Sequence, residues 1–157
     1  MRRPLRKTAL GSILIAGALL AVAVIVEAQQ QKKIPRIGYL RFQGTVMGDR
    51  IATFRQGMRQ LGYAEGKDFV IEQRNADGKL DRLNELATEL VRLKVDVIVT
   101  PGPGPTRAAK AATATIPIVM TQDPDPVGNG FVASVAHPGG NITGLSTLAP
   151  ELSGKQL

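Results

Sequence analysis

The residues best suited to bind a ligand lie in a short proline- and glycine-rich segment, residues 100–106 (TPGPGPT). Gly102 and Gly104 allow close backbone approach, and Thr106 can cap a following helix. Free amide groups at a helix amino terminus attract a carboxylate or a phosphate. We therefore predict that Gly102, Pro103, Gly104 and Thr106 contact a small ligand. The alternative is a stiff turn that binds nothing.

Two further segments carry aromatic and polar side chains that could contact the same ligand. Phe42 can line the mouth of a pocket, while Gln43 and Thr45 offer hydrogen bonds to a polar ligand group. In the other segment, the carboxylate of Asp123 can pair with a ligand ammonium. Each has an ordinary structural alternative, namely a ring packed under its own loop or a solvated turn. A calcium site is not expected, because the ligand spacing of a calcium loop is missing.

Residue types for catalysis or metal binding are scarce. The chain has no cysteine and a single histidine, His137, which is followed by a proline and two glycines. Neither a zinc site nor a serine–histidine relay can be assembled from this composition. Residues 44–50 (GTVMGDR) lack the spacing and the lysine of a phosphate loop, and no dinucleotide fingerprint is present. We expect neither an enzyme nor a bound cofactor.

The ligand candidates follow segments with strand character. Short apolar runs bounded by turn residues predict strands at residues 36–40, 69–74, 95–100, 116–120 and 142–145. Apolar or alanine-rich stretches with helical spacing predict helices at residues 49–61, 81–94 and 106–113. In the first of these helices Leu61 completes the apolar face, and Gly62 follows as a left-handed cap. Residues 127–136 are a candidate for a further short helix.

The alternation of strands and helices predicts an α/β fold, a doubly wound parallel sheet with helices on both faces. In such a sheet the ligand crevice lies outside the carboxyl ends of the strands, where the strand order reverses. The loops after the first, third and fourth predicted strands, residues 41–48, 101–106 and 121–129, are therefore expected to form the site. These loops contain every ligand candidate named above.

The first 28 residues predict export. Four basic residues lie within residues 1–7, and residues 9–26 carry no charge. This pattern is typical of a secretory signal peptide, with a predicted cut after Ala28. The alternative is an uncleaved membrane anchor, since an apolar run of about 18 residues is at the lower limit for spanning a bilayer. We expect an exported, periplasmic protein.

Composition and length indicate which partners are expected and how many domains the chain can form. Lysines and arginines outside the signal are scattered among acidic residues, and aromatic residues make up 4% of the chain. A nucleic-acid partner is therefore not expected. Because there is no cysteine, stability must come from a packed core, and a lipid-modified cysteine anchor is excluded. The length after the signal fits one domain.

Seven segments, in order along the chain, resemble bacterial ABC transporter substrate-binding proteins of the tryptophan/tyrosine type. They are residues 34–40 (IPRIGYL), 54–66 (FRQGMRQLGYAEG), 81–100 (DRLNELATELVRLKVDVIVT), 111–120 (AATATIPIVM), 125–128 (DPVG), 137–145 (HPGGNITGL) and 148–155 (LAPELSGK). The resemblance implies a two-lobed periplasmic-binding fold that closes on a small molecule and delivers it to an ABC permease in the membrane. It implies an amino acid or a related carboxylate as the ligand.

The resemblance also implies a domain plan. Residues 1–28 are expected to be the signal peptide, residues 29–35 a flexible lead-in, residues 36–147 the first lobe of a type I periplasmic-binding-protein-like fold, and residues 148–157 the start of a truncated crossover helix. Similar chains are about twice as long, so an amino-terminal fragment is expected. This chain has Arg41 and Phe42 where similar proteins have small residues, so an aromatic amino acid does not follow as the ligand.

Three other classes remain open from the sequence. A ligand-sensing domain of a sugar-type transcription regulator shares the fold, but an export signal stands where a DNA-binding segment would be. A flavodoxin-like enzyme or nucleotide binder would need a phosphate-cradling loop after the first strand. The third class is a membrane-tethered lobe that has no transport function.

Overall fold

The computed structural model describes residues 33–43 and 50–147. The predicted signal peptide at residues 1–28, Thr45, and the predicted crossover helix at residues 148–157 lie outside the described residues, so the predicted domain plan stays a prediction. The chain divides into two units, Met1–Lys33 and Ile34–Leu157. Every element discussed below belongs to the second unit.

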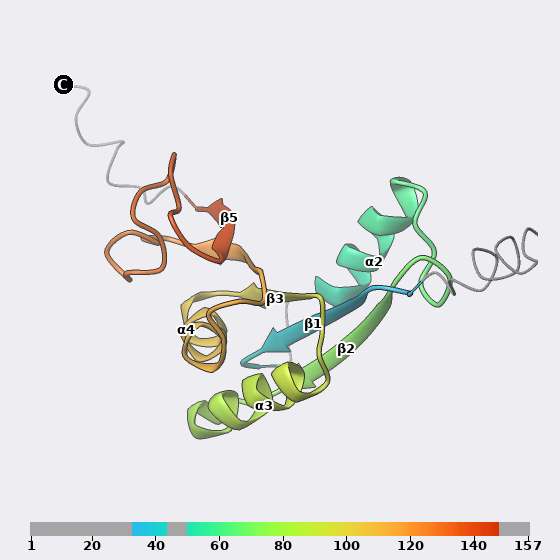
Figure 1. Cartoon of the computed structure of the whole chain (residues 1–157), viewed down its shortest axis with the longest axis horizontal. Coiled ribbons are helices and arrows are strands. Elements are labelled where there is room, and N and C mark those ends of the chain that lie inside the picture. Colours follow the sequence, from blue (N-terminus) through green and yellow to red (C-terminus); the bar gives the residue numbers. More distant parts are fainter. Residues whose placement is uncertain (1–32, 44–49, 148–157) are drawn as a thin grey trace, which may run out of the picture. The chain divides into compact units, whose positions relative to one another are not determined.

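Five parallel strands form one sheet in the order β2-β1-β3-β4-β5 (Figure 1). The strands are β1 (Arg36–Arg41), β2 (Val70–Asn75), β3 (Val97–Pro101), β4 (Ile118–Asp123) and β5 (Ile142–Ser146). Because β1 pairs with both β2 and β3, the strand order reverses between β1 and β3. The predicted parallel α/β sheet is confirmed, and all five predicted strands are present.

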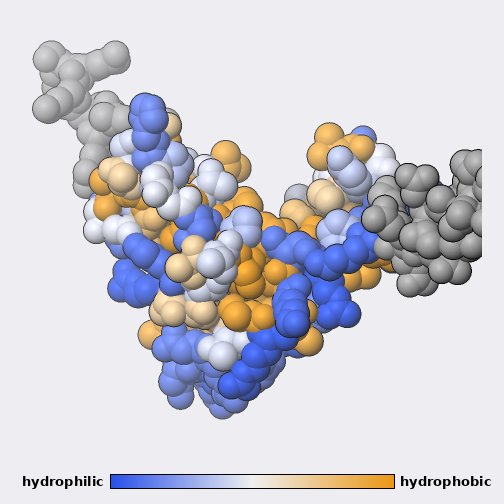
Figure 2. Space-filling view, in the orientation of Figure 1, coloured by the Kyte–Doolittle hydropathy of each residue, from blue (hydrophilic) through white to orange (hydrophobic). Residues whose placement is uncertain are grey.

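Within the described residues, three helices cover the sheet from its two faces (Figure 1). They are α2 (Arg50–Gln60), α3 (Leu80–Arg92) and α4 (Pro103–Ala112). The α3 and α4 helices pack on one face, and α2 packs on the other. On the face of the sheet that carries α2, Val97 and Val119 are only half-buried. Figure 2 shows apolar surface between α2 and β5.

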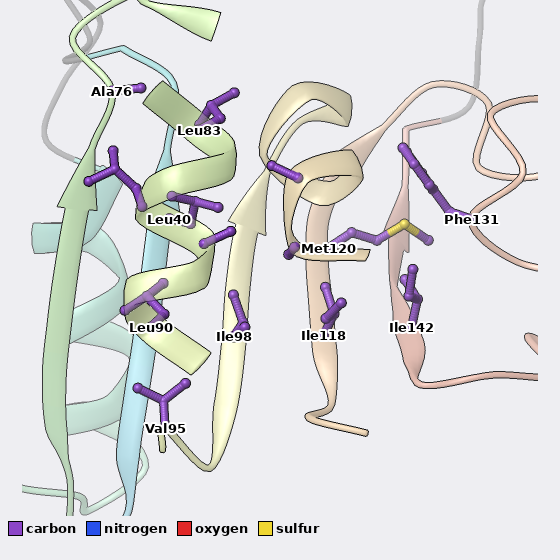
Figure 3. Close-up of a cluster of buried hydrophobic side chains, with 14 of the residues drawn as sticks. Leu40, Ala76, Leu83, Leu90, Val95, Ile98, Ile118, Met120, Phe131 and Ile142 are labelled. Carbon is purple, nitrogen blue, oxygen red and sulfur yellow. The ribbon is translucent and has the colours of Figure 1, made fainter. Parts of the chain in front are cut away.

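The larger core cluster lies between the sheet and the helices α3 and α4 (Figure 3). Leu83, Leu86 and Leu90 recur three and four residues apart along α3, so they share one buried face of that helix. They pack against strand residues such as Leu40 of β1. A side chain at Gly38 would bring its Cβ within 3.1 Å of Leu90 Cδ1, so the glycine lets α3 lie close to β1.

The second cluster fixes α2 against the opposite face of β1 and β3. Ile51, Phe54 and Met58 of α2 pack with strand residues that include Tyr39, whose ring centroid lies 6.1 Å from that of Phe54. The prediction that Leu61 completes this face is wrong, because Leu61 is 74% exposed.

The physical reason lies two residues beyond α2. The helix ends at Gln60, and Gly62 then adopts a φ of +86°. The amide of Gly62 donates to the Arg59 carbonyl, and the amide of Tyr63 donates to the Met58 carbonyl. This left-handed turn caps the helix as predicted, and Leu61 lies within it instead of on the buried face.

Two helix predictions need correction. The α4 helix begins at Pro103, three residues before the expected start at Thr106. Prolines are tolerated in the first turn of a helix, because amide groups there have no hydrogen-bond partner within the helix and proline loses nothing by lacking one. Gly102, with a φ of +91°, takes the position before Pro103. Thr106 therefore lies inside the helix and does not cap it.

Residues 127–130 form a turn and residues 131–136 have no regular structure, so the predicted short helix there is absent. The amide of Asn129 donates to the Asp125 carbonyl, but the next turn is diverted. Gly130 has a φ of +68°, and the amides of Phe131 and Val132 both donate to the Pro126 carbonyl. The diversion turns Phe131 and Val132 into the larger core cluster.

Candidate ligand-binding site

A cavity of about 170 Å³ lies at the carboxyl ends of β1 and β3. It is lined by Tyr39, Arg41, Phe42, Gln43, Arg50 and Pro101. These residues come from the end of β1, the loop after it, the start of α2 and the end of β3. Because the strand order reverses between β1 and β3, the cavity occupies the position where open α/β sheets bind ligands.

The apolar walls of this cavity are anchored in the two core clusters. Tyr39 is buried in the α2-side cluster, and Phe42 is half-buried against the cluster under α3 and α4. The backbone around Phe42 is also fixed, because its carbonyl accepts a hydrogen bond from the amide of Gly78 at 2.8 Å. The walls are therefore held in place by the fold.

Two arginines supply the charge of the cavity. Arg50, the first residue of α2, donates from Nη1 to Oε1 of Gln122 on β4. Arg41, at the end of β1, faces the side chain of Gln73 on β2. With the Gln73 amide oxygen turned toward the guanidinium, Arg41 Nη2 donates to it at 2.9 Å. Both guanidinium groups are thus oriented by neutral amide oxygens.

The residues predicted in the loop after β3 divide between two environments. Pro103 and Gly104 line a separate groove of about 390 Å³, against Leu83 and other residues of α3. Thr106 is fully buried, and its Oγ1 lies 2.9 Å from the Gly102 carbonyl oxygen and 2.8 Å from Oγ1 of Thr100. The Thr106 hydroxyl is therefore satisfied within the fold.

Asp123 is fully buried at the end of β4 and does not line the cavity after β1. Its Oδ1 accepts hydrogen bonds from the amide of Asp125 at 2.9 Å and from Nδ2 of Asn129 at 3.0 Å. Its Oδ2 has no hydrogen-bond partner among the residues that the structure describes. The carboxylate holds the turn that follows β4.

Of the predicted ligand residues in the described part of the chain, the structure places Phe42 and Gln43 in the same cavity. Sequence reasoning missed its other four lining residues, Tyr39, Arg41, Arg50 and Pro101. A signal for Arg50 was available, because a cation in the first turn of a helix opposes the helix dipole and calls for another explanation. Arg41 directly follows a predicted strand, in a loop already selected as part of the site.

Two further findings concern the described ranges, 33–43 and 50–147. These residues contain no cluster of three or more metal-ligating side chains. They also contain no helix that is both long enough and apolar enough to cross a bilayer.

Comparison with known proteins relates this chain to one family. The family model described as ABC transporter substrate binding protein matches residues 43–153. No curated protein matches the chain.

Solved structures that share the fold include the following three. One is the ligand-free, open structure of a substrate-binding protein with adhesive properties from Clostridium difficile, with 27% identity and a TM-score of 0.69 over 74% of this chain and 40% of that chain. A conserved domain protein from Vibrio cholerae shows 32% identity and a TM-score of 0.67 over 75% and 40%. An ABC domain in complex with L-Trp from Streptococcus pneumonia shows 28% identity and a TM-score of 0.66 over 71% and 38%. This chain thus matches about two fifths of the length of each.

Proposed function

Because this chain belongs to the family of ABC transporter substrate-binding proteins, we propose that it supplies one lobe of a two-lobed protein that binds a small molecule for transport. The observation that carries the proposal is the cavity between the ends of β1 and β3. In this proposal Tyr39, Phe42 and Pro101 form one wall of the ligand site. The ligand passes unchanged to an ABC permease, so no catalysis is required.

The size of the cavity supports a site shared between two lobes. Complete small-molecule sites usually enclose roughly 300–1,000 Å³. The cavity here measures about 170 Å³, which is smaller than a complete site and agrees with a site that a second lobe completes. Closure of a second lobe would complete the enclosure and exclude water from the polar contacts, which strengthens them.

The proposal extends to the other predicted ligand residues and to the location of the protein. Thr45 and Gln43 would offer hydrogen bonds to the ligand from the loop after β1. Gly102 would border the site just before α4, while Pro103 and Gly104 line the separate groove and the buried Thr106 and Asp123 would support the site from behind it. The protein would act in the periplasm after cleavage behind Ala28, with an amino acid or a related carboxylate as its ligand.

A bulky substitution in the cavity tests whether the ligand binds there. Gln43 lines it with an exposed side chain, so Gln43→Trp would fill the space while leaving both core clusters intact. The complete protein, purified from the exported fraction, is expected to release a small molecule on denaturation, detected by mass spectrometry. The Gln43→Trp protein should bind that molecule at least about tenfold more weakly in calorimetry.

Gln60→Trp is the matched control, because Gln60 is exposed at the other end of α2. It should bind as the unmodified protein does. Equal affinity in Gln43→Trp, with an unchanged melting temperature, would place the ligand elsewhere. If the exported protein carried no small molecule and bound none, the transport proposal itself would fail.

A further inference from the structure

Resting on the ligand site proposed above, we infer that this site selects an organic anion with an apolar body over the matching neutral or zwitterionic molecule. Arg41 and Arg50 are the recognising cations. The apolar body lies against Phe42 and Pro101.

The first step concerns charge. Four other arginines form ion pairs with carboxylates within the described residues, namely Arg36, Arg55, Arg74 and Arg82. Arg41 and Arg50 instead meet the amide oxygens of Gln73 and Gln122. An amide oxygen orients a guanidinium without neutralising it. Two formal positive charges therefore remain at one cavity within the described part of the chain.

The second step concerns donors. A guanidinium has five N–H donors, and the described contacts use one of them on Arg50 and two on Arg41. The remaining donors can meet an anionic oxygen pair, and an arginine fork matches a planar carboxylate especially well. Arg50 also opens the 11-residue helix α2, whose amino-terminal dipole adds positive potential at the same place.

The third step concerns orientation. Arg41 and Arg50 come from different elements, and each is tied to a further strand, Arg41 to β2 and Arg50 to β4. The backbone under Arg41 is fixed because its carbonyl accepts a hydrogen bond from the amide of Ala76 at 3.0 Å. Groups held in this way lose little freedom when a ligand binds, which favours affinity.

The fourth step excludes an ammonium group from this end of the site. Among the residues that the structure describes, those lining the cavity include no carboxylate. Asp123, which the sequence suggested as a partner for an ammonium, is fully buried in its own turn. A ligand ammonium beside Arg41 and Arg50 would meet like charges, which disfavours it.

The test uses the complete protein and sets of molecules that share one body. Each set contains a carboxylate, the phosphonate, the primary amide and the α-amino acid of the same aliphatic or aromatic body. Calorimetry at low salt is expected to show at least one anion binding about tenfold or more tightly than its amide and its amino acid. The carboxylate and phosphonate arms identify which anion is preferred. Affinity should fall as salt is raised.

Variants assign the effect to the two arginines. Arg41→Gln and Arg50→Gln should each weaken the anion about tenfold and leave the amide unchanged. Arg50→Lys should restore part of the loss, because it keeps the charge but not the fork. The control is Arg59→Gln, an exposed arginine in the last turn of the same helix, which should change nothing.

Two results would overturn the inference while leaving the transport proposal intact. One is binding of an amide or amino acid as tightly as its acid in every set that binds. The other is an equal loss for acid and amide in the arginine variants, which would mean that the arginines act on lobe closure or folding. Failure of every set, together with an exported protein that carries no ligand, would count against both proposals.

Discussion

At the scale of single residues, the hydroxyl pair of Thr100 and Thr106 lies under the carboxyl end of β3. Both side chains are fully buried, and their oxygens are 2.8 Å apart. With the Gly102 carbonyl accepting from Thr106, the Thr100 hydroxyl is left to donate to Thr106. This chain of hydrogen bonds ties the end of β3 to the first turn of α4.

Thr106→Val should therefore destabilise the fold, because it leaves the Thr100 hydroxyl buried without its partner. The expected loss in the free energy of unfolding is about 1–3 kcal/mol, measured by urea denaturation. Thr115→Val, at an exposed position after α4, is the control and should change little. The double variant Thr100→Val with Thr106→Val should cost less than the sum of the single changes. Strict additivity would show that the two hydroxyls do not depend on each other.

At the scale of elements, Gly144 decides how closely β5 can pair with β4. Its φ is +146°, and an added Cβ would overlap the backbone carbonyl of Met120. Gly144→Ala should lower the free energy of unfolding by about 3 kcal/mol or more, since backbone must move to make room. Gly57→Ala should instead raise it by about 0.5–1 kcal/mol, because Gly57 is helical and its Cβ would meet nothing within 4 Å. Thermal or urea melts of the two variants should therefore move in opposite directions, and similar melts for both would refute this account.

The elements also show where sequence reasoning succeeds and where it stops. Apolar spacing in residues 81–94 predicted α3 well, because Leu83, Leu86 and Leu90 form one buried face. It failed at residues 127–136, where backbone bonds to Pro126 divert the chain. The loop after β1 was selected from topology alone, yet the role of Arg50 depends on Gln122, which is 72 residues away in sequence. Such a pairing follows from strand order and cannot be predicted from local pattern.

At the scale of the whole molecule, this chain matches about 40% of the length of its structural relatives. Its cavity is also smaller than a complete small-molecule site. Residues 29–157 produced alone should therefore bind ligand weakly or not at all. The physical reason is that an open wall leaves the ligand and the two arginines in contact with water, where a charge-assisted hydrogen bond contributes less than in an enclosed site. Calorimetry with the isolated segment is expected to give no binding in the micromolar range.

The same ligand should bind the complete protein at least about a hundredfold more tightly, a ratio that the enclosure of a few polar contacts can supply. The isolated segment must first be shown to be folded, by a cooperative melt that Gly144→Ala shifts downward. With that condition met, micromolar binding by residues 29–157 would mean that the cavity between β1 and β3 is a complete site. Closure by a second lobe would then serve contact with the permease and would not be needed for affinity.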